Sequence, residues 1–339
     1  MCQNKLTHYD RKSKTWFTSL LFKQNPPTLG SNKLKALSIL RKVETSTIKN
    51  KKVAQVNAAF NEFIEKGFAK EVFEDSEPEQ VHYLPGHAVF KEDSTTNTRI
   101  VFNASATSDT GNTLNECLFQ GPCLLPDIVQ VLIRFRLNPI AFTLDSSKMF
   151  LRIKLDHGKD YLRFFWRNCD QSQKPRIFRM TSVTFGVISS PFQAIDVVLK
   201  HADLFAQIYP LAAATVRDQL YMDDVPAGSK NFEEAKNTIG ELLAFFMEAN
   251  MKPHKFASNV PDILQAIPIE SKSPETSVKV LGVIWDTKQD SLLLNLKNLS
   301  TASKQDTKRS FLEVAAKIFD PLGLFSPFTT KVKLLFQEV

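Results

Sequence analysis

The sequence predicts an α+β fold. Some segments place apolar residues at helical spacing, and others alternate apolar and polar residues at the period of a strand. The two kinds of segment do not follow each other in strict βαβ order, which disfavours a doubly wound sheet. With 339 residues, 43% of them hydrophobic, the chain can bury a large core, which we expect to be divided into two or three subdomains.

Positive charge is concentrated near the start of the chain. Residues 1–70 contain 14 Lys or Arg against 4 Asp or Glu, whereas the whole chain has 43 against 36. Such clustering attracts a polyanionic backbone through counterion release, and it also occurs on merely soluble helical surfaces. Because Pro26, Pro27 and Gly30 interrupt regular structure, we expect residues 1–52 to form a basic, extended lead-in.

The composition argues against several classes of protein. No apolar run is long enough to span a membrane, and the first residues lack the apolar region of a signal peptide. The four cysteines have neither the spacing of a zinc site nor that of a disulfide framework. We therefore expect a reduced, cytoplasmic protein without a membrane partner.

Helix and strand signals alternate in the first half of the chain. Apolar residues within 53–64 recur at helical spacing, and Gly67 supplies a stop. Residues 82–90 and 99–102 predict the two strands of a hairpin that a polar loop joins. Pro126 is placed to begin the next helix.

The middle of the chain shows the alternation of half-buried strands. In residues 140–145 the large apolar side chains fall on one face, and Asp145 ends the strand on the other. Residues 151–155 repeat this alternation, and residues 161–166 and 176–185 predict further strands.

Helices and one strand complete the prediction. Ser190 is placed to cap a helix, and Asn231 is placed to cap another together with Glu234. Residues 278–285 predict a strand, and residues 311–319 predict an apolar-striped helix.

Two adjacent aspartates, Asp223 and Asp224, follow Tyr221 and Met222 in an apolar setting. Like charges at this range repel each other unless a cation lies between them, and Mg²⁺ with oxygen ligands is the usual cation. A solvated turn would also explain the pair, because Asp is common in turns. Asp145 ends a strand earlier in the chain, and two elements that each deliver carboxylates can hold two Mg²⁺ ions about 3.5–4 Å apart.

The triplet Asp109-Thr110-Gly111 allows a different interpretation, because it matches the triplet of an aspartic protease. A protease needs this aspartate between apolar strands, so that two copies can share a proton. Residues 103–113 instead form a polar loop, which disfavours a protease. A third interpretation is a nucleic-acid-binding protein without catalysis, which the basic residues 1–70 would support.

Eight separate segments carry a further signal. They are NPPTLG at 25–30, YLPGHAVFK at 83–91, RIVFNAS at 99–105, FTLDSSKMF at 142–150, VTFG at 183–186, SPF at 190–192, YMDD at 221–224 and IFDPLG at 318–323. In this order they resemble the reverse transcriptase region of Pao/BEL-type long-terminal-repeat retrotransposon polyproteins. The resemblance covers essentially the whole chain.

The resemblance implies a right-hand polymerase with fingers, an antiparallel palm sheet with packed helices, and the start of a thumb or connection. On this basis we expect fingers at residues 53–139 and the palm at 140–285, with a fingers insertion near 157–182. Residues 286–339 would then begin the thumb or connection, apparently truncated. The RNase H and integrase regions that follow in such polyproteins are expected to be absent.

The resemblance also implies an activity, that of an RNA-directed DNA polymerase. Such a nucleotidyltransferase uses an RNA or DNA template with a primer, together with deoxynucleoside triphosphates. Asp145, Asp223 and Asp224 fall on the metal-binding carboxylates of the family, which hold two Mg²⁺ ions that Mn²⁺ can replace. The implied location is the cytoplasm, including virus-like particles. A decayed copy would retain only nucleic-acid binding, and such polyproteins also encode an aspartic protease.

Five more residues fall on the nucleotide site of the family. Arg99 and Lys91 fall on cations that contact the triphosphate, although a solvated hairpin with stray charges is an alternative. Phe150 falls on the steric gate against a 2′-hydroxyl, although aromatic residues more often pack in cores. Phe185 and Gly186 resemble the loop beneath the nascent base pair, where a glycine permits close approach of the backbone.

Two weaker correspondences and two departures remain. Lys255 corresponds loosely to a palm lysine that protonates pyrophosphate, and a surface lysine is the simpler interpretation. The pair Leu281 and Gly282 resembles the hairpin that grips the primer. Asn103 and Ser147 stand where the family has acidic residues. Neither is a metal ligand by the resemblance, but both favour an inactive copy.

Overall fold

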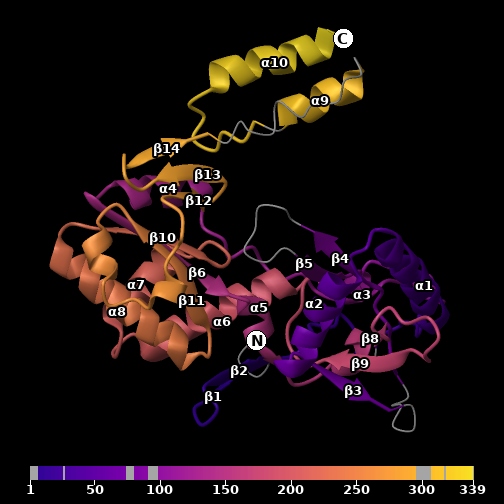
Figure 1. Cartoon of the computed structure of the whole chain (residues 1–339). Helices are drawn as coiled ribbons and strands as arrows, with labels where there is room; N and C mark the ends of the chain where they lie inside the picture. Colours follow the sequence, from indigo (N-terminus) through magenta and orange to yellow (C-terminus); the bar gives the residue numbers. More distant parts are fainter. Residues whose placement is uncertain are drawn as a thin grey trace. The chain divides into compact units, whose positions relative to one another are not determined.

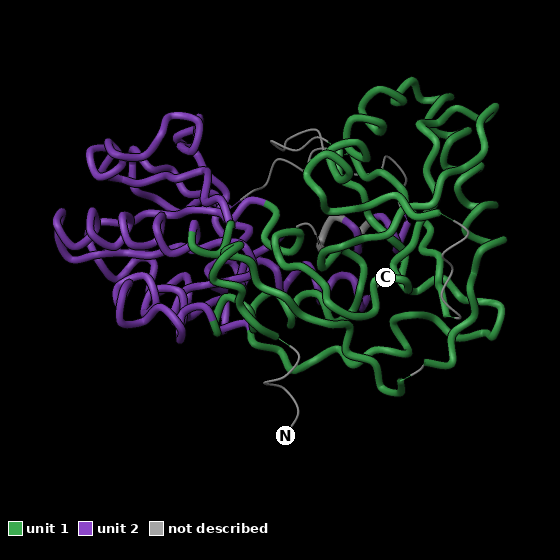
Figure 2. The backbone as a smooth tube through the Cα atoms, turned by 90° about the horizontal axis from the view of Figure 1, so that it is seen from below, with its two compact units in different colours: residues 1–124, 148–200, 248–250 green, residues 125–147, 201–247, 251–339 purple. Residues whose placement is uncertain are grey.

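The computed structural model describes residues 7–25, 27–73, 80–90, 98–294, 307–316 and 318–338. Within them the chain folds into two compact units that exchange segments (Figure 2). Unit 1 contains residues 1–124, 148–200 and 248–250, and unit 2 contains residues 125–147, 201–247 and 251–339. Each unit is therefore assembled from segments far apart in the sequence, and neither coincides with one of the contiguous spans expected from the resemblance.

Unit 1 contains a long helix that the sequence did not predict. Helix α1 (Lys33–Lys49) lies within the segment predicted to be extended, so that prediction is wrong over this range. Its buried positions recur at helical spacing, but two of them are the polar residues Glu44 and Thr47. The apolar stripe is therefore incomplete, and hydrophobic periodicity alone gives too weak a signal for a helix.

The next helix follows the prediction. Helix α2 (Val53–Glu65) buries Val56, Phe60 and Phe63. The chain leaves this helix through Gly67, whose φ of 66° lies in the left-handed region that glycine adopts without strain.

Three small sheets complete unit 1 (Figure 1). Strands β4 (Gly86–Phe90) and β5 (Thr98–Phe102) form the expected antiparallel hairpin, in which Arg99 lies opposite Val89. The other sheets have the strand orders β3–β9–β8 and β1–β2–β7. Their strands are β3 (Ala69–Val72), β9 (Arg176–Met180), β8 (Arg163–Trp166), β1 (His8–Asp10), β2 (Thr15–Thr18) and β7 (Lys154–Leu155).

The strand predicted at residues 151–155 is wrong over its first half. Met149–Arg152 forms the short helix α5, and strand β7 contains only Lys154 and Leu155. Three consecutive side chains of α5 are buried, which one helical turn permits and an alternating strand does not. Two further short helices of unit 1 are α3 (Leu114–Cys117) and the 3₁₀ helix η3 (Lys159–Leu162), and η3 delays the start of β8 relative to the prediction.

Unit 2 contains the antiparallel sheet that carries the predicted carboxylates. Strand β6 (Ile140–Ser147) is central, between β10 (Asp224–Ser229) and β11 (Lys252–Ser258). Residues 141–144 are all buried, because both faces of β6 are covered. Helices α4 (Ile128–Arg136) and α7 (Pro210–Gln219) pack against β10 (Figure 1).

Two longer helices lie before and after β10 in the sequence. Helix α6 (Ser190–Phe205) starts at the predicted Ser190, and the boundary between the two units falls inside it. Helix α8 (Phe232–Glu248) starts after Asn231, whose Oδ1 accepts a hydrogen bond from the main-chain N of Glu234 at 3.0 Å. Glu234 in turn accepts from the main-chain N of Lys230 at 2.8 Å. The predicted capping arrangement is therefore confirmed, except that Glu234 binds the residue before Asn231 and not Asn231 itself.

A second small sheet of unit 2 replaces the single strand predicted at residues 278–285. It consists of β12 (Ser277–Val280), β13 (Val283–Asp286) and β14 (Ser291–Leu293). Leu281 and Gly282 form the loop between β12 and β13, with φ values of 47° and 95°. Positive φ at both central residues is typical of a type I′ turn, which reverses the chain in two residues.

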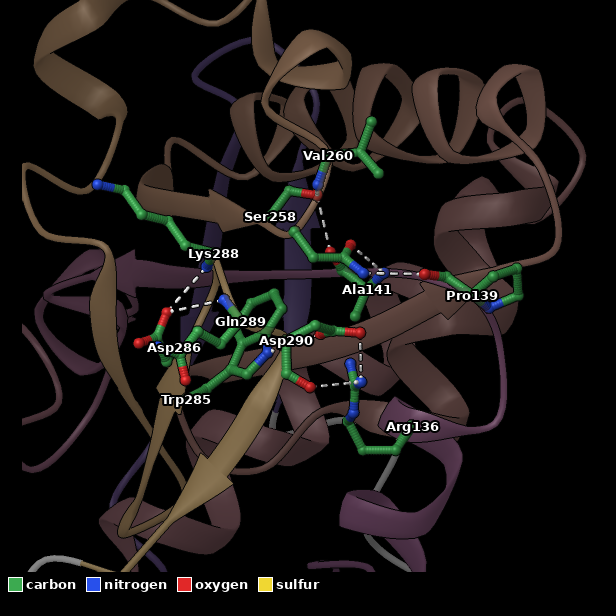
Figure 3. Close-up of polar contacts among 11 residues, drawn as sticks. Arg136, Pro139, Ala141, Ser258, Val260, Trp285, Asp286, Lys288, Gln289 and Asp290 are labelled. Carbon is green, nitrogen blue, oxygen red and sulfur yellow. Dashed lines mark hydrogen bonds and ion pairs between the residues drawn. The ribbon is translucent and has the colours of Figure 1, made fainter.

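The two sheets of unit 2 share one hydrophobic core. It contains Trp285, which is fully buried, together with residues of α4, β6, β11, β12 and β13. A polar network next to Trp285 links the same elements (Figure 3). Asp290 accepts from Trp285 Nε1 at 3.0 Å and from Arg136 Nη2 at 2.6 Å, while Ala141 N donates to Asn259 at 2.9 Å.

The described chain ends with helices α9 (Lys308–Ala316) and α10 (Ser326–Glu338), which contact each other. No residue of α10 is buried among the described residues. The remaining short helices are η4 (Pro261–Leu264) and η5 (Ile269–Ser271). Among the described helices, none combines the length and the apolar character that a membrane span requires.

Candidate active site

The strand register of unit 2 brings the predicted carboxylates together. Asp145 lies directly opposite Asp224 in the antiparallel pair of β6 and β10. Directly opposed residues project from the same face of a sheet, with Cβ atoms about 4.5–5.5 Å apart. Two aspartates from distant parts of the sequence therefore share one face at the end of the sheet.

The third carboxylate, Asp223, lies in a tight two-residue loop. Tyr221 and Asp224 pair across the loop through main-chain hydrogen bonds of 2.9 and 3.1 Å. Ser146 N donates to the main-chain oxygen of Asp223 at 2.8 Å, which ties the loop to the end of β6. The predicted hairpin turn is thus confirmed as a feature of the backbone.

Met222, the first residue of this loop, has a strained backbone. Its φ is 59°, in the left-handed region that residues with a side chain seldom adopt. Such conformations cost on the order of 1–3 kcal/mol and cluster at functional sites, where the surrounding structure enforces them. Here the enforcing contacts are the two bonds between Tyr221 and Asp224 and the bond from Ser146.

The electrostatics of the site are unfavourable without a cation. Burial, together with the negative charges of Asp223 and Asp145, raises the pKa of Asp224 to about 7. Lys255 and Lys279 act in the opposite direction, but they do not offset the burial and the repulsion. A carboxyl pKa this close to neutral pH indicates that positive charge does not balance the negative charge of the three aspartates.

Lys255 supplies part of the missing positive charge. Its Nζ donates to Oδ2 of Asp145 at 2.8 Å. Asp145 is 17% exposed and Lys255 38%, so the ion pair is only partly screened by water. His254 lies beside it, and its Nδ1 is 2.9 Å from the main-chain oxygen of Asp145 and 3.8 Å from Oδ1.

A β-bulge in β11 directs Lys255 toward Asp145. His254 pairs with Asp145 and Ala257 pairs with Thr143, so two residues of β11 oppose the single residue Leu144. Lys255 has a φ of 55°, as the first residue of such a bulge does when it adopts the left-handed conformation. Bulges next to active sites change the direction of a side chain, and this one places the ammonium group at a carboxylate.

The three aspartates fit a divalent metal by their chemistry. They are hard oxygen donors, and the raised pKa of Asp224 reflects a site that a cation would stabilise. The ammonium group of Lys255, a monovalent cation, already binds one oxygen of Asp145. As the side chains stand, however, no group of three or more Asp, Glu, His or Cys residues among the described ranges is placed to hold a metal ion.

The structure places the predicted nucleotide residues in unit 1. Arg99 is exposed on β5, and its side chain makes no hydrogen bond or ion pair within the described chain. Phe150 is only 6% exposed, and its ring packs against that of Phe185 with the centroids 4.9 Å apart. These are contacts of a core aromatic, so the gate stays a prediction. Lys91 lies outside the described residues.

Gly186 has a structural requirement of its own. Its φ is 96°, and a Cβ at this position would overlap the main-chain oxygen of Phe102. Asn115 also donates to the main-chain oxygen of Gly186 at 3.2 Å. The close backbone approach predicted at this glycine is therefore made by the protein itself, and a role toward a base pair stays a prediction.

The sequence analysis favoured a surface position for Lys255 and did not identify His254. The bulge that positions them has no sequence periodicity, so nothing in the pattern indicated that Lys255 faces Asp145. Asp109, the alternative catalytic aspartate, lies in an exposed turn of unit 1 rather than between apolar strands. This environment does not match the one that a shared-proton protease pair requires.

Three comparisons with known proteins bear on this site. A family model described as the Pao retrotransposon-like RNaseH-like domain matches residues 307–339. The fold is similar to that of the foamy viral protease-reverse transcriptase dRH solved in complex with double-stranded DNA, with a TM-score of 0.54 and 13% identity over 82% of this chain and 42% of that one. The foamy viral protease-reverse transcriptase solved in complex with an RNA/DNA hybrid has the same TM-score and 12% identity, over 83% and 32% of the two chains. No curated protein matches the sequence.

These findings support a retroelement polyprotein region. The chain spans less than half the length of either viral protein, and at these identities the likeness shows the fold alone. That fold is a mixed α+β fold similar to the one in a protein that contains a retroviral polymerase.

The family match bears on one expectation. The RNase H region was expected to be absent, but residues 307–339 match a family model with an RNaseH-like description, so the expected absence is wrong for this segment. Its described part consists of α9, α10 and the turn that joins them. The assignment of residues 286–339 to a thumb or connection stays a prediction.

Proposed function

We propose that this retroelement region is an RNA-directed DNA polymerase that transfers nucleotides by a two-metal mechanism. The observation that carries the proposal is the register of β6 and β10, which sets Asp145 opposite Asp224 beside the loop that carries Asp223. The foamy viral proteins of similar fold were solved with nucleic acid, which supports a nucleic-acid substrate. The substrates would be an RNA or DNA template with a primer, and deoxynucleoside triphosphates.

In this proposal the sheet β10–β6–β11 is the centre of a polymerase palm. The fingers would correspond to residues 53–139 and the insertion near 157–182, and the palm to the rest of 140–285. The division into units gives partial support, because residues 148–200 belong to the same unit as most of the fingers segment. The cytoplasm, including virus-like particles, is the proposed location.

Asp145, Asp223 and Asp224 would hold the two Mg²⁺ ions, for which Mn²⁺ could substitute. When bound, such ions lower the pKa of a primer 3′-hydroxyl and neutralise charge on a triphosphate. The protein contributes the fixed positions of the carboxylates, through the opposed strands and the strained loop at Met222. Lys255, held at Asp145 by the bulge, would move aside or turn toward the phosphates when the ions bind.

The remaining predicted residues have proposed roles at the nucleotide. Arg99 and Lys91 would contact the triphosphate, and Arg99 is exposed as such a role requires. Phe150 would restrict the sugar, supported behind by its contact with Phe185. Phe185 is 38% exposed, so part of its ring is accessible to a base, and Gly186 fixes the turn that presents it.

Primer extension tests the proposal. We expect extension of oligo(dT) on poly(rA) with Mg²⁺ or Mn²⁺, and a loss of at least about a hundredfold in Asp223→Asn and Asp145→Asn, because each removes charge from the site. Asp218→Asn is the matched control, since Asp218 is an exposed aspartate of α7 in the same unit. Equal extension by wild type and Asp223→Asn would refute the assignment. No extension by any of the proteins would favour a nucleic-acid-binding remnant.

A further inference from the structure

Unit 1 contains a basic hollow to which no role has been assigned so far. It has a volume of about 260 Å³ and lies between the end of α1, the turn into α2, and β4. The side chains that line it include Lys42, Ser46, Asn50, Lys52, His87 and Phe90. No acidic residue lines the hollow among the described residues.

Among the described residues, little negative charge compensates the positive charge around the hollow. Residues 41–52 contain five Lys or Arg and a single acidic residue, Glu44. Glu44 is fully buried and binds the guanidinium of Arg167 through two hydrogen bonds of 3.0 and 2.7 Å. Its charge is therefore already paired on the inner side of α1. Neither Lys42 nor Lys52 forms an ion pair within the described chain.

Lys52 is held in place at the hollow. Its Nζ lies 3.7 Å from the centroid of the Phe90 ring, a cation–π contact that orders a side chain which is otherwise flexible. Lys52 is partly buried, whereas Lys42 is exposed on α1. The two ammonium groups and the side-chain amide of Asn50 are donors without acidic partners, which suits an anion with several oxygen atoms.

We propose that this hollow binds a phosphate of one nucleic-acid strand, independently of sequence. Ammonium groups contact phosphates as point charges, and such contacts fix a strand without reading its bases. The neighbouring Arg41, Lys49 and Lys51 extend the positive surface, so a strand with regularly repeated phosphates gains more there than a single anion. The inference rests on the proposed function only in taking nucleic acid as the ligand.

Salt-dependent binding of a labelled single-stranded RNA, measured by fluorescence anisotropy, tests the inference. The measurement uses the whole chain with EDTA and without nucleotides, between about 50 and 200 mM salt. The logarithm of the affinity falls linearly with the logarithm of the salt concentration. Each phosphate contact that is lost on a single strand reduces the magnitude of this slope by about 0.7. Because the hollow holds one phosphate, we expect the magnitude of the slope to fall by about 0.7 in Lys42→Gln/Lys52→Gln, and the affinity to fall about tenfold at the lowest salt.

Two control proteins isolate the hollow from net charge and from folding. Lys12→Gln/Lys236→Gln loses the same charge at exposed positions outside the hollow and should keep the wild-type slope. Lys42→Arg/Lys52→Arg keeps both positive charges and should also keep the slope, which excludes misfolding as the cause. Equal slopes in the glutamine variant and the wild type would overturn the proposal. Competition by poly-glutamate as effective as by unlabelled RNA would overturn it as well.

The outcome is independent of catalysis. RNA binding is measured without metal or nucleotide, so it does not depend on nucleotide transfer. If primer extension fails in every protein while the slope still falls in Lys42→Gln/Lys52→Gln, the polymerase assignment fails and the phosphate site stands. If extension succeeds and the slopes are equal, the phosphate site alone is refuted.

Discussion

Lys255 and Asp145 form an ion pair of 2.8 Å across the sheet of unit 2, from a strand that bulges to make the contact. The ammonium group occupies an oxygen atom that the proposed metal ions would need. The site therefore contains its own partial counter-charge, and divalent cations have to compete with it.

Lys255→Met should strengthen the binding of Mn²⁺ to the chain without nucleic acid. The variant removes the ammonium group that binds Oδ2 of Asp145, so this group no longer competes with Mn²⁺ for the oxygen. We expect about tenfold tighter binding at pH 8, corresponding to about 1.4 kcal/mol. Electron paramagnetic resonance of free Mn²⁺ in a titration measures the affinity directly.

Lys255→Arg is the control for this titration, because it keeps a cation at the bulge and should keep the wild-type affinity. An unchanged affinity in Lys255→Met would mean that the ammonium does not compete with the metal. Asp145→Asn in the same titration should abolish the difference between lysine and methionine at position 255.

The raised pKa of Asp224 predicts a pH dependence of stability without metal. The folded state holds the proton up to about pH 7, whereas the unfolded chain releases it near pH 4. Because the folded pKa lies above the unfolded one, the contribution to stability is fully present below about pH 4 and is lost as the pH rises through 7. The loss is on the order of a few kcal/mol.

Thermal unfolding in EDTA measures this dependence. Between about pH 4 and 8 the melting temperature of the wild type should fall relative to that of Asp224→Asn, whose amide does not titrate. Addition of Mg²⁺ above pH 7 should restore part of the loss, by mass action on the folded state. Parallel curves for the two proteins would contradict the pKa assignment.

The sequence predicted those features that depend on local periodicity and short motifs. Helix α2, the hairpin of β4 and β5, the central strand β6 and the turn after Tyr221 follow from spacing and turn residues alone. Helix α1 was missed because Glu44 fills a buried position that periodicity expects to be apolar. That position is polar because Arg167, from a distant segment, supplies its partner.

The sequence predicted the carboxylates of the candidate site but not the position of Lys255 beside them. Adjacent aspartates in an apolar setting are visible in a sequence, because their repulsion needs an explanation. The register that sets Asp145 against Asp224, and the bulge that turns Lys255, arise from pairing between distant strands. No local pattern encodes such pairing, so these contacts required the structure.

The buried pair of Glu44 and Arg167 should stabilise unit 1 by holding α1 in place. Glu44→Gln leaves the guanidinium buried with a weaker partner, and we expect a loss of about 3–5 kcal/mol in the free energy of unfolding. Lys14→Met, which breaks the exposed pair with Glu248, is the control and should change stability by less than about 1 kcal/mol. Urea denaturation compares the two, and equal losses would contradict the assigned role.

Gly186→Ala should destabilise the protein independently of any ligand. The new Cβ would overlap the main-chain oxygen of Phe102, and the φ of 96° is unfavourable for alanine, so we expect a loss of about 2 kcal/mol or more. Gly240→Ala is the matched control, because Gly240 lies in α8 with nothing near its missing Cβ. That change should stabilise the protein by about 0.5–1 kcal/mol through helix propensity.

Denaturation curves of the two alanine variants separate a structural glycine from a functional one. If Gly186→Ala folds with wild-type stability yet loses primer extension, Gly186 acts on the substrate and not through the contact with Phe102. If stability and extension fall together, and Gly240→Ala gains stability without a change in extension, the requirement for glycine comes from the protein backbone. We expect the second result, because Phe102 and Gly186 belong to the same compact unit and approach each other closely there.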